Sequence, residues 1–181
     1  MKPLLIFSFV TLFLLTSCAS KKSIPTEEER KALELIVSNK TFEIESDFAY
    51  PQVTNAVQQV LNSGLLQPGS TPGGINLIGN PNYLRVRNDS VISYLPYFGE
   101  RQMRAGYGSG DGAIQLKSIM KDYSAQLNKD GSYSIDFNAE GQSENFQVYL
   151  RLFPNLKSTM VLNGIFRLPI QYSGSIKPME N

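Results

Sequence analysis

The sequence predicts an α+β fold, mostly an antiparallel β meander or partial barrel with one N-terminal helix. Three observations predict this fold: an amphipathic segment near the start of the domain, repeated segments in which apolar and polar residues alternate, and short turns between those segments. One-sided alternation favours antiparallel pairing with one solvated face, because buried parallel strands are apolar on both faces. The sheet should therefore enclose a core on one side only.

The helix is expected to begin after Thr26 and to end near Asn39. Thr26 and Glu29 have the spacing of a capping box, in which each side chain accepts a hydrogen bond from the backbone amide of the other residue. Apolar residues then recur at helical spacing at Leu33, Ile36 and Val37. A helix of about three turns needs tertiary contacts for stability, so it should pack on the structure that follows it.

Alternation of period two predicts the strands. In the first strand Phe42, Ile44, Phe48 and Tyr50 share the apolar side, whereas residues 43, 45 and 47 are acidic.

The segment 52–62 fits either a helix or extended structure, and the composition of 64–81, which is rich in Gly and Pro, predicts an irregular loop. Turns are expected at 88–90 and 128–131. The predicted strands are 41–51, 83–87, 91–95, 114–117, 123–127, 133–137, 146–152, 159–162 and 166–172.

The first 17 residues are typical of a secretory signal peptide, with Lys2 followed by an apolar run too short to span a bilayer as a helix. Leu15-Thr16-Ser17-Cys18 resembles the lipobox of bacterial lipoproteins, in which the cysteine carries the lipid. The alternative is a signal-anchor that happens to contain a cysteine. We expect a signal peptide over 1–17, a lipid-bearing tether over 18–25 and a single β-rich domain over 26–181. In bacteria whose lipoproteins reach the outer face of the cell, Lys and acidic residues typically follow the lipid-bearing cysteine closely. Here the first acidic residues are at 27–29, so the expected location is the outer membrane, facing the periplasm.

Composition excludes several classes of chemistry. The sequence contains no His and no Trp, and Cys18 is the only Cys. Without His, neither a Ser-His-Asp nor a Cys-His catalytic arrangement can form. The usual protein ligands of zinc and haem are also missing, so no cofactor or metal is expected. Removal of Lys2 with the signal leaves 16 basic and 16 acidic residues. A neutral chain has no general affinity for phosphate backbones, so we expect no nucleic-acid partner.

The segment 94–112 is the strongest candidate for a binding site. It combines aromatic residues, both charge signs and five glycines, and its predicted contact residues are Tyr97, Arg101, Arg104 and Tyr107. The structural alternative is that the loop folds over an open core and its aromatic residues plug the end. Arg85, Arg87, Arg151 and Arg167 are expected on a solvated face.

Residues 83–99, including Leu95-Pro96-Tyr97-Phe98-Gly99, and Ile170-Gln171-Tyr172-Ser173-Gly174 resemble a Bacteroidetes lipoprotein family catalogued only as domain of unknown function 4251. The resemblance extends over nearly the whole mature chain and includes Gly106-Tyr107-Gly108. It implies a small α+β domain outside the cytoplasm. It supplies no catalytic residues.

These observations predict a lipid-anchored cell-envelope protein that binds a small ligand or a protein partner and is not an enzyme. The alternative is a hydrolase that acts on envelope polymers. Lacking His, it would depend on paired carboxylates, as glycosidases do. The acidic residues in the sequence do not single out such a pair.

The lipid anchor is directly testable. Replacement Cys18→Ala should abolish lipidation and release the protein from membranes, because the acyl chains supply the membrane affinity. Membrane fractionation with and without a globomycin-type inhibitor of lipoprotein processing measures this. Unchanged migration and fractionation under inhibition would disprove the anchor.

Overall fold

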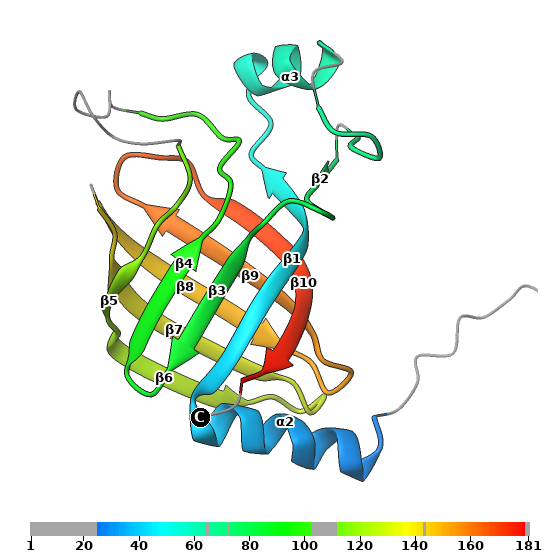
Figure 1. Ribbon diagram of the computed structural model, residues 1–181, viewed down its shortest axis with the longest axis vertical. Coiled ribbons are helices and arrows are strands. Elements are labelled where there is room, and N and C mark those ends of the chain that lie inside the picture. The colour runs from blue at the N-terminus through cyan, green and yellow to red at the C-terminus, as the bar shows by residue number, and fades with distance from the viewer. Residues whose placement is uncertain (1–24, 64–65, 72, 103–111, 143, 180–181) are drawn as a thin grey trace, which may run out of the picture.

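A computed structural model describes residues 25–63, 66–71, 73–102, 112–142 and 144–179, which form two helices and ten strands. The strands build one antiparallel sheet that curls into a nearly closed barrel (Figure 1). This confirms the expected antiparallel β fold with an N-terminal helix. The elements are α2 (Glu27–Asn39), β1 (Thr41–Pro51), α3 (Asn55–Asn62), β2 (Ile75–Asn76), β3 (Tyr83–Arg87), β4 (Ser90–Tyr94), β5 (Lys117–Ile119), β6 (Lys121–Leu127), β7 (Tyr133–Glu140), β8 (Asn145–Leu152), β9 (Lys157–Gly164) and β10 (Ile170–Pro178).

The strand order is β5-β4-β3-β1-β10-β9-β8-β7-β6, and β2 pairs with β1 beside this path. Neighbours in the sheet are mostly neighbours in sequence, as in a meander, and the β1–β10 pair joins the two ends of the chain. The two edges of the sheet, near β5 and near β7, also contact each other. Leu116, just before β5, forms a bridge with Gly141, just after β7, and the Glu140 amide donates to the Ser118 hydroxyl at 2.9 Å. These contacts nearly close the barrel.

Helix α2 covers one end of the barrel (Figure 1). The predicted capping box is present: the Glu29 amide donates to Thr26 Oγ1 at 3.2 Å, and the Thr26 amide donates to Glu29 Oε2 at 2.8 Å. The apolar side, with Leu33, Ile36 and Val37, is buried against the sheet as predicted. The undecided segment 52–62 contains helix α3, which projects from the opposite end. None of the helices in the described ranges is long and apolar enough to cross a membrane.

The inward-facing side chains form one hydrophobic cluster that fills the barrel. Among the largest fully buried side chains are Phe42, Phe137 and Tyr172, which come from three different strands. The Tyr172 hydroxyl donates to the Pro96 carbonyl at 2.9 Å, so this buried polar atom is satisfied. A ligand inside the barrel would have to displace these side chains.

The predicted sidedness of β1 is correct at its start and wrong at its end. Phe42 and Ile44 are buried as expected, but the β1–β10 register shifts between Ser46 and Phe48. One extra residue in a strand reverses the faces that follow it. Ala49 therefore faces the core, and Phe48 and Tyr50 lie outside, where the Tyr50 hydroxyl is 3.0 Å from the Ser173 hydroxyl.

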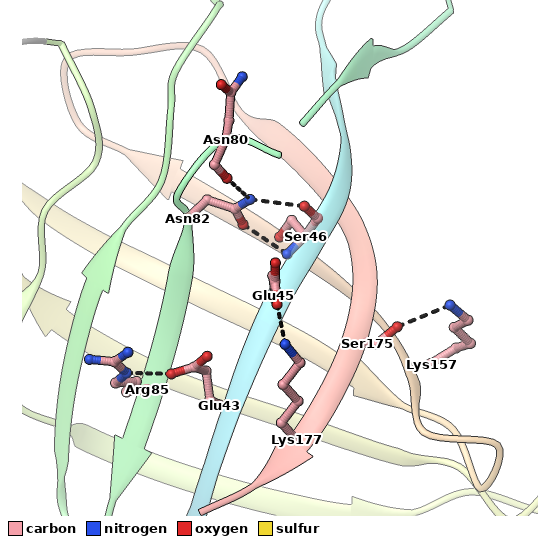
Figure 2. Close-up of polar contacts among 9 residues, drawn as sticks. All are labelled: Glu43, Glu45, Ser46, Asn80, Asn82, Arg85, Lys157, Ser175 and Lys177. Atoms are coloured by element: carbon pink, nitrogen blue, oxygen red, sulfur yellow. Dashed lines mark hydrogen bonds and ion pairs between the residues drawn. The ribbon is translucent and has the colours of Figure 1, made fainter. Parts of the chain in front are cut away.

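Asn82 holds β1 at this irregularity. Its side chain accepts a hydrogen bond from the Ser46 amide at 2.8 Å and donates to the Ser46 carbonyl at 2.9 Å, as Figure 2 shows. The carboxamide thus replaces the partner strand just before β3 begins. Figure 2 also shows ion pairs from β1 to both neighbours, Glu43 with Arg85 on β3 and Glu45 with Lys177 on β10. These pairs are exposed and contribute little to stability.

Other strand boundaries differ from the prediction. The last strand begins at residue 170 rather than 166, and the predicted loop 64–81 contains the short strand β2. The predicted apolar side of β6 is only partly enclosed, because β6 is the last strand of the sheet order. Tyr123 packs on Phe137, whereas Leu127 is 60% exposed. The turn at 128–131 is confirmed, with Gly131 at φ 80°.

Gly174 provides a test of the β1 irregularity. A Cβ at this position would lie 1.9 Å from the Glu45 carbonyl oxygen and 2.6 Å from Ser46 Cα, both backbone atoms that cannot rotate away. We predict that Gly174→Ala lowers the free energy of unfolding by about 3 kcal/mol or more. Gly73→Ala, which meets only the Thr71 hydroxyl at 3.8 Å, is the control. Equal losses in chemical denaturation would show that the close approach is unimportant.

Candidate functional site

The structure places Tyr97 and Arg101 at the end of the barrel opposite α2. Both follow β4, in a segment that crosses toward β10: the Leu168 amide donates to the Glu100 carbonyl, and the Gln102 amide donates to the Phe166 carbonyl. The other predicted site residues, Cys18, Arg104 and Tyr107, lie outside the described residues. The described part of the predicted site is therefore part of the wall that covers this end of the barrel.

Tyr97 packs as a plug. Its ring lies against the core cluster, and its hydroxyl is 2.9 Å from the Glu100 carbonyl oxygen and 3.0 Å from that of Leu168. Burial raises the pKa of Tyr97 to about 12. The hydroxyl is thus a neutral donor committed to backbone acceptors, which matches the structural alternative for this segment.

Arg101 lies beside a second arginine. Its guanidinium donates to the Gly112 carbonyl at 3.2 Å, and Arg167 donates to the same carbonyl at 3.1 Å. One backbone oxygen therefore holds two cationic side chains that come from segments 66 residues apart in sequence. Arg101 and Arg167 also form an isolated β-bridge through their backbones.

Arg167 forms a buried ion pair with Glu144. Nε donates to Glu144 Oε1 at 2.5 Å, and the two side chains are only 6% and 3% exposed. The expectation that Arg167 belongs to a solvated face is wrong, because β10 begins only at Ile170 and residues 164–169 turn over the barrel end. The expectation holds for Arg85, Arg87 and Arg151, which are exposed. Sequence alternation alone carries no signal for this pairing.

The ion pair joins Glu144, which directly precedes β8, to the loop between β9 and β10. Glu144 Oε2 accepts a hydrogen bond from the Phe166 amide at 2.8 Å. The Arg167 guanidinium lies 5.0 Å from the Tyr97 ring centroid and 5.6 Å from that of Phe146, within reach of cation–π attraction. Gly164 permits this packing, since a Cβ there would lie 2.5 Å from Glu144 Oε2.

A groove of about 450 Å³ lies next to this cluster, on the outer side of β6–β9. We call it the outer groove. It is within the range of about 300 to 1,000 Å³ that is usual for ligand sites. Most of the residues that line it have polar side chains, although more of its exposed lining surface is apolar than polar, and it shares Phe146 and Gly164 with the surroundings of the ion pair. The residues that form it are Lys121, Asp122, Asn138, Ala139, Glu140, Asn145, Phe146, Gln147, Asn163, Gly164 and Ile165.

Four carboxamide side chains line the outer groove. Asn138 pairs in register with Gln147, which pairs with Asn163 on the next strand, so the three side chains form a row across β7, β8 and β9. We call these three residues the carboxamide row. Among the described residues, Gln147, Asn163 and the neighbouring Asn145 make no side-chain hydrogen bond, whereas Asn138 donates to Asp122 at 2.9 Å.

A smaller hollow of about 200 Å³ continues along the same face, with Tyr149 and Arg151 following Gln147 at alternate positions of β8. Tyr149 is 39% exposed. The sequence alone does not single out this surface, because alternating polar residues on a strand are typical of any solvated face. The available signal was that four carboxamides, Asn138, Asn145, Gln147 and Asn163, lie on three successive predicted strands or at their ends.

The fold and the groove define a small barrel-like domain with a filled interior and a polar surface groove. The model of the family described as "Domain of unknown function (DUF4251)" matches residues 25–176, and the chain belongs to this family. A crystal structure of a DUF4251 family protein from Bacteroides eggerthii DSM 20697 has the same fold: the TM-score is 0.54 at 15% identity, covering 83% of this chain and 88% of that one. No curated protein matches the chain significantly.

Acidic residues do not gather into a metal site in the described part of the chain. No group of three or more potential His, Cys, Asp or Glu ligands occurs there. In the outer groove, Glu140 pairs with Lys121 at 2.7 Å and Asp122 accepts from Asn138. These contacts leave the carboxamides as the groups most available to a ligand.

The buried ion pair should be essential for stability. We predict that Arg167→Met lowers the free energy of unfolding by about 3 to 5 kcal/mol, because it leaves the Glu144 carboxylate buried without its partner. Lys177→Met, which removes an exposed pair, should cost far less than Arg167→Met. Chemical denaturation of both variants measures the difference. A loss at Arg167 no larger than at Lys177 would contradict this role.

Proposed function

We propose that this protein is a lipid-anchored cell-envelope component that binds its ligand or partner through the outer groove and performs no catalysis. The observation that carries the proposal is the carboxamide row, in which Gln147 and Asn163 present unpaired hydrogen-bonding side chains in a groove on the sheet. Polar side chains that lack partners in the protein are available to an external molecule.

The filled interior supports a site on the outside. Barrel proteins that hold a small ligand inside keep a cavity for it. Here Phe42, Phe137 and Tyr172 occupy the interior, α2 covers one end, and Tyr97 packs at the other. Binding at the outer groove displaces none of these side chains.

The proposed anchor is consistent with the extent of the folded domain. The family match begins at residue 25 and α2 begins at Glu27, so the proposed lipid site at Cys18 precedes the domain by a short tether. A tethered domain of this kind is exposed to envelope polymers and to other envelope proteins. We assign Tyr97 and Arg101 to packing the barrel end; a contact role for Arg104 and Tyr107 stays a prediction.

Site-specific crosslinking in cells tests the proposal. A benzophenone amino acid at Gln147 should crosslink to an envelope component, because the side chain lines the groove and is the central member of the carboxamide row. The matched control is the same amino acid at Gln126, an exposed carboxamide on the outer side of β6. We expect a product of higher mass at Gln147 only. Equal products at both positions, or none at either, would contradict binding by the groove.

A further inference from the structure

We propose that the outer groove binds an uncharged glycan chain built from N-acetylated sugars. This inference rests on the proposed function and names the class of ligand. It follows from the hydrogen-bonding groups of the groove, their spacing, the apolar side chains at its margins and its charge.

The hydrogen-bonding groups match an acetamido sugar. A carboxamide has two donors and an acceptor in one plane. The side chains of Gln147 and Asn163 are both unpaired among the described residues. An acetamido group offers the complementary carbonyl and N–H, and a sugar hydroxyl donates and accepts, so Gln147 and Asn163 can each make two bonds to one sugar.

The spacing matches a polymer rather than a single sugar. Asn138, Gln147 and Asn163 are directly paired across three neighbouring strands. Neighbouring strands lie about 4.8 Å apart, which is close to the length of one pyranose ring in an extended β-linked chain. A glycan that crosses the strands would therefore place one sugar at each carboxamide.

Apolar side chains lie where the less polar parts of such a sugar need contacts. Ile165, which lines the groove after Gly164, is 61% exposed and can pack on an acetamido methyl group. Tyr149 follows Gln147 on the same face of β8, and its exposed ring offers a surface for the C–H face of a pyranose.

The charge of the outer groove favours a neutral chain over an anionic polymer. The Lys121 ammonium is paired with Glu140 at 2.7 Å, which leaves the Asp122 carboxylate as the uncompensated charge of the groove. A negative groove disfavours phosphate-rich or uronate-rich chains, which require clustered cations. A neutral chain avoids this repulsion.

Titration calorimetry of the folded domain with a linear tetramer of β-1,4-linked N-acetylglucosamine tests the inference. The comparison ligand is the β-1,4-linked glucose tetramer, which has the same linkage but no acetamido groups. We expect the N-acetylated tetramer to bind at least tenfold more tightly. Gln147→Ala should weaken its binding at least tenfold, which corresponds to about 1.4 kcal/mol and to the loss of one or two hydrogen bonds. Gln126→Ala, the matched control, should change the affinity less than twofold.

The outcomes separate this inference from the proposed function. Equal binding of both tetramers, or binding that Gln147→Ala leaves unchanged, overturns the glycan assignment. If neither tetramer binds but the crosslink at Gln147 persists and yields a protein, the glycan inference is wrong and the proposed function stands. If the crosslink also fails, both are wrong. Far-UV circular dichroism of Gln147→Ala and Gln126→Ala confirms that each variant is folded.

Discussion

The irregularity in β1 opposite Gly174 is the constraint on which the barrel depends. β1 is the strand that joins the N-terminal strands β3 and β4 to the C-terminal strands β7–β10. The extra residue after Ser46 bends this strand, and a bend of this kind increases local twist. Gly174 lets the two backbones approach, and the Asn82 carboxamide satisfies the Ser46 amide and carbonyl that the bend leaves without a strand partner. A sheet curled in this way brings its two ends together.

The buried pair of Arg167 and Glu144 acts in a similar way at the end of the barrel. Desolvation of two charges is costly, and the pair is tolerated because its hydrogen bonds to Gly112 and Phe166 satisfy further polar atoms. The pair thus joins the start of β8 to the loop between β9 and β10. Asn145 begins β8 and Ile165 lies in the loop after β9, so the shape of the outer groove depends on a pair that does not itself face it.

The candidate site illustrates what local sequence cannot predict. The segment around Tyr97 has the composition of a binding loop, yet in the structure the Tyr97 hydroxyl is bonded to backbone carbonyls. Arg167 looks like a surface residue of an alternating strand, yet it is buried. Conversely, Gln147 and Asn163 are ordinary polar positions of two strands. They become a site only through the strand register, which places them side by side.

The sequence by itself determined the α+β class, the capping box of α2, most strand positions and the turn at Gly131, because each of these depends on residues close together in the chain. It also excluded chemistry that needs histidine. Tertiary structure decided the reversal of faces in β1, the burial of Arg167 and the alignment of the carboxamide row. Each of these depends on contacts between segments far apart in sequence, and alternation within one strand reports which residues share a face but not which residues of other strands lie beside them.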